Sequence, residues 1–127
     1  MYLTLTTVFG FLAVALGAFG AHALDGVLTA YQQDIWQKAV NYQMFHTVAL
    51  GLVCVLMARS QSKSLLFAAR FFSAGTILFS GSLYILALTG ISKLGMVTPF
   101  GGVAFLAGWA MLFAYSFKHQ TAQNQQG

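Results

Sequence analysis

Four long stretches of this chain contain no aspartate, glutamate, lysine or arginine, and together they cover most of its 127 residues. The stretches are residues 2–24, 39–58, 71–92 and 94–117. Each reaches the ~20 residues with which an α-helix crosses ~30 Å of hydrocarbon. Because the bilayer interior offers no water to unpaired backbone groups, each stretch predicts a helix. We expect an all-α fold, a four-transmembrane-helix bundle in which residues 1–118 form a single domain.

The composition excludes several classes of protein. Only 6% of the residues are charged and 58% are hydrophobic, whereas soluble domains are about one quarter charged. The six basic residues lie between apolar stretches and form no stripe that could follow a phosphate backbone, so we expect no nucleic-acid partner. The single cysteine, Cys54, excludes a disulfide within the chain. The partner that the composition predicts is the lipid bilayer.

The connection between the first two apolar stretches, residues 25–38, is more polar. Its apolar residues are spaced as on one face of a helix: Val27, Leu28, Tyr31 and Ile35. This spacing predicts a short interfacial amphipathic helix between transmembrane helices one and two. Tyr31 and Trp36 would lie at the level of the lipid headgroups.

The last apolar stretch has recognisable ends. Thr98 and Pro99 are typical of the N-cap and first turn of a helix. After Lys118 the chain is rich in glutamine, asparagine and glycine, which predicts a disordered polar tail over residues 119–127.

The basic residues predict an orientation in the membrane. With four spans, one side would carry Arg59, Lys63, Arg70 and Lys118, and the other side would carry Lys38 and Lys93. Because positively charged loops remain in the cytoplasm, this imbalance predicts that both termini are cytoplasmic.

Polar and titratable side chains lie at the end of the first apolar stretch, at the start of the second and within the third. The candidate cluster consists of His22, Asn41, Tyr42, Gln43, His46, Ser80 and Tyr84. In an antiparallel hairpin, His22 and His46 could lie at the same depth and bind a metal or haem iron, or handle protons. The alternative is that each histidine is neutral and hydrogen-bonds a neighbouring helix. We favour this alternative, with no metal and no cofactor, because a metal needs three or four ligands.

The third apolar stretch carries a weakly polar stripe at helical spacing, made of Ser73, Thr76, Ser80, Tyr84 and Ala87. The stripe could line an aqueous path, or it could hydrogen-bond other helices. The second interpretation is favoured because hydroxyls and small residues commonly join transmembrane helices. Ser80, Gly81 and Ser82 could bend this helix, and Gly17 and Gly81 are expected at close helix contacts.

Short motifs along nearly the whole chain resemble those of a known family. They are Gly17 to Leu24, Trp36, Ala39, Tyr42-Gln43, His46, Phe79 to Tyr84, Leu88 to Gly90, Thr98 to Gly102 and Gly108-Trp109. In this order they resemble the domain of unknown function 423 family, also called UPF0382, and the eukaryotic transmembrane protein 256. The resemblance implies a multi-pass protein of the bacterial inner membrane. It implies no activity and no residue roles.

No hydrolase triad, phosphate loop or pair of carboxylates is present in the sequence. We therefore expect a non-enzymatic structural or accessory membrane component that forms a homo-oligomer or joins a larger membrane complex. The alternative is a small channel or carrier for an ion or small solute, with a cavity lined by Tyr42, His46, Ser80 and Tyr84.

Overall fold

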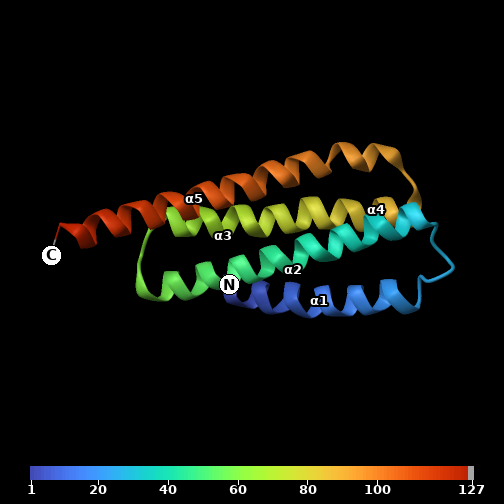
Figure 1. The fold of residues 1–127 in the computed structure, drawn as a ribbon, viewed down its shortest axis with the longest axis horizontal. Coiled ribbons are helices and arrows are strands. Elements are labelled where there is room, and N and C mark those ends of the chain that lie inside the picture. The colour runs from blue at the N-terminus through green and yellow to red at the C-terminus, as the bar shows by residue number, and fades with distance from the viewer. Residues whose placement is uncertain (126–127) are drawn as a thin grey trace.

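A computed structural model describes residues 1–125, and these residues contain helices and no β-strand (Figure 1). In chain order the elements are α1 (Tyr2–His22), α2 (Ala30–Arg59), α3 (Lys63–Gly75), the π-helix η1 (Thr76–Ser80), α4 (Gly81–Thr89), the 3₁₀-helix η2 (Ser92–Met96) and α5 (Thr98–Asn124). The segments Tyr2–His22, Ala30–Arg59, Lys63–Thr89 and Ser92–Asn124 are each long and apolar enough to cross a membrane. The predicted all-α fold with four transmembrane spans is confirmed.

The predicted interfacial helix between spans one and two is wrong. Residues 23–29 form turns, and the amphipathic residues from position 30 onward belong to the continuous helix α2. The reason lies in the sequence of its first turns. Thr29 and Gln32 form a reciprocal capping box that starts the helix at Ala30. No proline or glycine follows before Gly51, so nothing interrupts the helix at Lys38.

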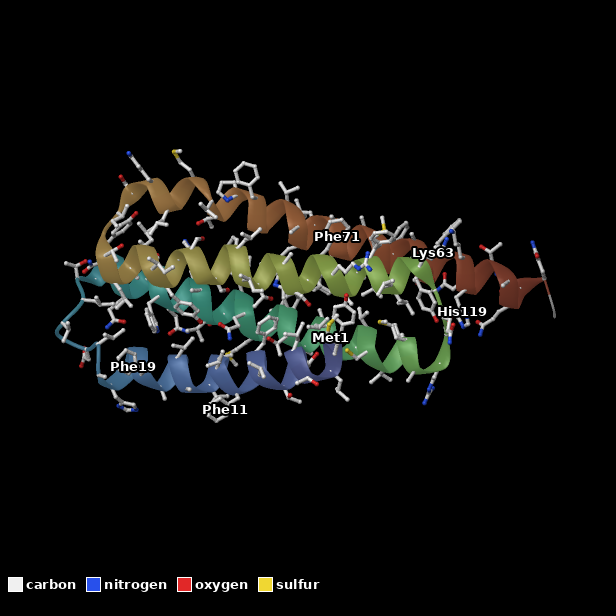
Figure 2. All side chains as sticks on the ribbon, turned by 180° about the vertical axis from the view of Figure 1, so that it is seen from behind. Met1, Phe11, Phe19, Lys63, Phe71 and His119 are labelled. Carbon is white, nitrogen blue, oxygen red and sulfur yellow. The ribbon has the colours of Figure 1, made fainter. Side chains whose placement is uncertain are left out.

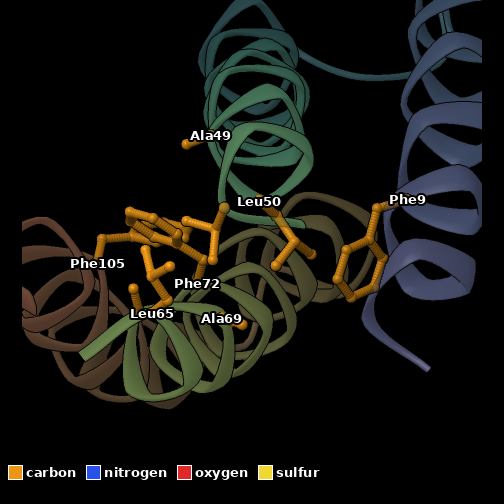
Figure 3. Close-up of a cluster of buried hydrophobic side chains, with 9 residues drawn as sticks. Phe9, Ala49, Leu50, Leu65, Ala69, Phe72 and Phe105 are labelled. Carbon is orange, nitrogen blue, oxygen red and sulfur yellow. The ribbon is translucent and has the colours of Figure 1, made fainter. Parts of the chain in front are cut away.

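The helices form a row with α2 and α3 in its middle (Figures 1 and 3). Helix α1 packs chiefly against α2, and α5 packs against α3 and η1 on the other flank. The outer side of α1 faces lipid, and its Phe11 is 75% exposed (Figure 2). This arrangement leaves α2 packed against α1, α3, η1 and α4.

The core consists of two clusters of buried apolar side chains. The larger one lies between α2, α3 and α5 with a contribution from α1, and includes Phe9, Leu50, Leu65, Phe72 and Phe105 (Figure 3). The smaller one lies between α2 and α4 near the loop of residues 23–29, and includes Leu24, Ile35, Trp36, Ala39, Val40, Leu83 and Ala87. In a bilayer these contacts supply packing rather than removal from water.

The third span is interrupted by a π-helical turn, η1, at Thr76–Ser80. Ser73 precedes this turn and Thr76 begins it, and their hydroxyls donate to the carbonyls of Ala69 and Phe72, four residues earlier. Such bonds compete with the regular helical ladder. The irregularity therefore lies immediately before Gly81, next to the serines that were expected to bend the span.

The start of α5 differs from expectation, and its end lies beyond the predicted span. Thr98 is the first helical residue rather than the N-cap, and its hydroxyl lies 2.8 Å from that of Ser82 on α4. At the other end α5 continues to Asn124 and so includes part of the predicted polar tail. Alanine and glutamine are good helix formers, which allows an existing helix to continue there. Residues 126 and 127 of that tail lie outside the described residues.

Candidate functional site

Gln43, in the middle of α2, connects three helices. Its side chain is 3% exposed. Its Nε2 donates to the carbonyl of Phe9 on α1 at 2.8 Å, and its Oε1 accepts from the hydroxyl of Tyr84 on α4, also at 2.8 Å. A buried amide inside a membrane is stable only where its donors and acceptor are engaged. These partners account for the burial of Gln43 and Tyr84 together.

His46, one turn further along α2, connects to α5. Trp109 donates its indole N–H to Nε2 of His46 at 3.1 Å. An indole can only donate, so Nε2 must accept, and the proton of the ring lies on Nδ1. This Nδ1–H donates to the carbonyl of Tyr42 at 2.9 Å. The imidazole is thus a neutral ring with both nitrogens engaged, stacked on Phe105 with ring centroids 3.5 Å apart.

Two further bonds join neighbouring helices by the same means. Ser80 in η1 donates to the carbonyl of Ala39 on α2 at 2.7 Å. Trp36 on α2 donates to the carbonyl of Leu16 on α1 at 2.9 Å. Of the buried polar side chains in residues 1–125, only the Thr47 hydroxyl has no partner. On the third span, Ser80 and Tyr84 bond to α2 as the favoured interpretation predicted, whereas Ser73 and Thr76 bond within their own helix.

His22 lies away from this cluster, on an exposed position at the end of α1. Gln43 lies beside Phe9, and His22 is a further 13 positions along α1, roughly 20 Å at the rise of an α-helix. The expectation that His22 and His46 share a depth is wrong, because the first turns of α2 pass beside the end of α1. Asn41 is exposed, and its side chain accepts from Gln37 on the same helix.

A groove of about 820 Å³ lies between α2 and α5. One wall comes from α2 and comprises Asn41, Tyr42, Phe45 and His46, and Phe79 of η1 lies at its base. The facing wall comes from α5 and comprises Pro99, Gly102, Val103, Phe105, Leu106 and Trp109. Of the four residues expected to line one cavity, Tyr42 and His46 line this groove, whereas Ser80 and Tyr84 do not. The groove is far more apolar than the candidate cluster suggested.

Trp109 is the functional partner that sequence reasoning missed. Its indole N–H fixes the tautomer of His46, and its ring closes one end of the groove. A signal was available, because a tryptophan in the middle of an apolar span needs an acceptor for its N–H. The sequence does not say which helix provides that acceptor.

The described residues 1–125 contain no group of three or more His, Cys, Asp or Glu side chains placed to hold a metal ion. The hydrogen bonds of His46 give a separate chemical reason against ligation there. Its Nε2 lone pair is directed at the Trp109 N–H, and its Nδ1 carries the proton. A metal could bind either nitrogen only after one of these bonds had broken.

The chain is similar to known membrane proteins. The family described as protein of unknown function (DUF423) matches residues 16–102. A UPF0382 membrane protein of Staphylococcus haemolyticus is 47% identical over 108 residues, which is 84% of this chain and 87% of that protein. The UPF0382 inner membrane protein YgdD of Escherichia coli K12 is 48% identical over 103 residues, 81% of this chain and 79% of its own length.

The UPF0382 membrane protein YwdK of Bacillus subtilis is 42% identical over 120 residues, covering 94% of this chain and 98% of YwdK. No solved structure matches the chain. With relatives named as membrane or inner membrane proteins and four spans of its own, the protein is a multi-pass protein of the bacterial inner (plasma) membrane. The chain belongs to the DUF423 family, whose members have no known function.

Proposed function

We propose that this protein is a non-enzymatic structural or accessory component of the membrane, which self-associates or joins a larger membrane complex. The observation that carries the proposal is the use of its polar groups. Gln43, His46, Ser80 and Tyr84 are each engaged with another helix. Side chains that are hydrogen-bonded between helices cannot act as acids, bases or nucleophiles unless the bundle opens.

The exposed flanks support the same proposal. Only 11% of the most apolar window of span Tyr2–His22 is buried within the chain, and only 17% of that of Ser92–Asn124. The two outer helices therefore offer wide apolar surfaces on opposite sides of the row. Membrane proteins associate laterally through such surfaces by close packing of their helices.

The experiment is extraction of the tagged protein from native membranes into lipid nanodiscs, followed by mass measurement of the intact particles. We expect particles that hold two or more copies of the chain, or one copy with a second membrane protein. Single copies alone, obtained after cross-linking in the intact membrane and without any cross-linked product, would contradict the proposal. A control membrane protein of similar size that is known to be monomeric shows how often two copies enter one nanodisc by chance.

The channel or carrier alternative predicts transport instead. It needs a continuous polar path, whereas the Ser80 hydroxyl is 1% exposed and is bound to the Ala39 carbonyl. Ion and solute flux into liposomes containing the purified protein separates the two functions. Flux that disappears in His46→Ala would favour the alternative, and absence of flux in both forms is the expected result.

A further inference from the structure

The groove between α2 and α5 opens sideways from the bundle and not along its axis. Residues at its two rims are largely exposed: Phe45 is 61% exposed, Val103 64% and Leu106 71%. In the membrane these side chains face acyl chains. The groove is therefore continuous with the lipid phase, and whatever fills it enters laterally.

The length of the groove points to one leaflet. Along α5 it runs from Pro99, in the first turn, to Trp109. These ten positions correspond to about 15 Å of helix, or half of the ~30 Å hydrocarbon thickness. At its inner end the hydrogen bond from Trp109 to His46 joins the two walls. A partner transmembrane helix would continue beyond this point, whereas an acyl chain of a single leaflet ends near it.

Two opposite charges lie on α2 beyond the outer end of the groove, whose lining on this helix begins at Asn41. Lys38 precedes Tyr42 by four residues and Phe45 by seven, so all three lie on the groove side of α2. Asp34 lies one turn before Lys38, with 4.0 Å between its carboxylate and the ammonium group, and both side chains are more than half exposed. A lysine in this position extends toward the headgroup region. Helix α2 therefore presents a cation and an anion one turn apart, on the turns that precede the groove.

We propose that the groove binds one phospholipid of that leaflet, of the phosphatidylethanolamine type. Its acyl chain lies between α2 and α5 on Phe79. Its phosphate is met by Lys38 and its ammonium group by Asp34. The charge pair complements a zwitterionic headgroup better than an anionic one, because only the zwitterionic headgroup has an ammonium group that can pair with Asp34. This lipid site is separate from the association proposed above, since one isolated copy of the chain contains the whole groove.

The experiment is a lipid titration of the delipidated protein in detergent, followed by native mass spectrometry. Phosphatidylethanolamine and phosphatidylglycerol with identical acyl chains are compared. We expect one tightly retained phosphatidylethanolamine for each chain, and weaker retention of phosphatidylglycerol.

The variant that fills the groove is Gly102→Leu. A Cβ at Gly102 would meet only the Phe79 ring at 4.0 Å, so the leucine side chain can extend into the groove without a clash. We expect a loss of about tenfold or more in lipid affinity, because the leucine side chain takes the space of the acyl chain. The matched control is Ala18→Leu, at an exposed position on α1, which should retain the lipid as the unchanged protein does.

The headgroup is tested by charge variants. Lys38→Gln should weaken both lipids by about two- to fivefold, the size expected of an exposed ion pair. Asp34→Asn should weaken phosphatidylethanolamine and strengthen phosphatidylglycerol, so that the preference is reversed. Lys63→Gln removes the same charge as Lys38→Gln, but at the opposite end of the bundle, and should change neither affinity.

Several outcomes would overturn the proposal. Unchanged lipid binding in Gly102→Leu would place the lipid elsewhere. A Gly102→Leu variant that loses a dimer but keeps its lipid would assign the groove to a second copy of the chain. If Gly102→Leu does not fold, as judged by circular dichroism, the surface variants of Lys38 and Asp34 provide the test. Lipid affinities equal to those of the unchanged protein in these variants would refute the headgroup contacts.

Discussion

A histidine inside a membrane usually marks a transport or proton path. At His46 the partners on both ring nitrogens explain its presence without such a path. The Trp109 indole donates to one nitrogen, the Tyr42 carbonyl accepts from the other, and Phe105 stacks on the ring. A neutral imidazole can accept from α5 and donate to its own helix at the same time. The residue thus acts as a connector between helices.

The first prediction concerns this connection. Trp109→Phe keeps an aromatic ring but leaves Nε2 of His46 without a donor. We expect a loss of about 1 kcal/mol in the free energy of unfolding, since interhelical hydrogen bonds in membrane proteins have about this size. The measurement is reversible unfolding in mixed micelles. His46→Leu combined with Trp109→Phe should cost less than the sum of the single changes.

The matched control is the pair His22 and His46. Because His22 is exposed at the far end of α1, the effects of His22→Leu and His46→Leu should add. Coupling between these two residues, or strict additivity between His46 and Trp109, would contradict the structure.

The second prediction concerns glycines at helix contacts. A Cβ at Gly101 would lie 2.7 Å from the Cα of Phe79, which is backbone and cannot move aside. Gly101→Ala should therefore lower the free energy of unfolding by about 1–3 kcal/mol. Gly81→Ala is the control, because a Cβ there meets nothing within 4 Å. It should be neutral or slightly stabilising, because alanine favours helices.

This comparison corrects the sequence-based view that Gly81 lies at a close helix contact. The same unfolding measurement on both variants checks it. Equal destabilisation by Gly81→Ala and Gly101→Ala would mean that α4 packs differently from the arrangement described here. The sequence alone cannot rank these glycines, since each stands in an equally apolar stretch and their neighbours come from other spans.

At the scale of the element, η1 is the feature that sets the direction of α4. A π-helical turn holds an additional residue, so the helix after it is rotated relative to the helix before it. This rotation determines where Tyr84 and Ser82 lie: Tyr84 donates to Gln43 on α2, and Ser82 pairs with Thr98 on α5. The hydroxyl-rich sequence of the span indicated an irregularity, but its type depends on these tertiary partners.

The third prediction tests the role of η1. Deleting Ile77, which is 60% exposed, should restore a regular helix and rotate α4 by about 100° relative to α3. In a Cys54→Ala background, Ser82→Cys with Thr98→Cys should form a disulfide, because the two native hydroxyl oxygens lie 2.8 Å apart. The deletion should abolish this disulfide, as read by the mobility of the oxidised protein on a denaturing gel.

A suitable control is deletion of Gln123, near the end of α5, which should leave the disulfide unchanged. Efficient disulfide formation in the Ile77 deletion would show that α4 keeps its direction without the π-turn. It would then be packing against α2 that determines the direction of α4.

The fourth prediction is made at the scale of the whole molecule. In the four-span fold the connection of residues 60–62 and the end of α5 lie on the same side, together with Arg59, Lys63, Arg70 and Lys118. We expect this side to be cytoplasmic by the positive-inside rule. A reporter that is active only outside the cytoplasm should give no signal at the C-terminus and a clear signal when it is inserted after Gly26.

The opposite pattern of signals would reverse the orientation. Changing Arg59 and Lys63 to glutamine is an informative companion experiment, because it removes half of the positive charge on that side. If these charges set the orientation, a mixture of both orientations should appear.

The sequence predicted the number of spans and the helical class, because crossing hydrocarbon leaves few alternatives. It predicted less of the site. The role of Gln43, His46, Ser80 and Tyr84 as hydrogen-bonding groups followed from the cost of unpaired polar groups in lipid. Their partners, Phe9, Trp109 and Ala39, did not follow, since a row and a closed square of four helices satisfy the same apolar pattern. The groove depends on this row and was therefore not predicted.

The bonds of Gln43 and His46 also suggest an order of assembly during synthesis. Trp36 and Gln43 bond to carbonyls of α1, so the α1–α2 hairpin can form these contacts before α3 has left the ribosome. At this stage the Oε1 of Gln43 and the Nε2 of His46 have no partner, because Tyr84 and Trp109 belong to later spans. The nascent hairpin thus has two unpaired acceptors in the bilayer. The third span then binds one of them through the Tyr84 hydroxyl, and the fourth span binds the other through the Trp109 indole.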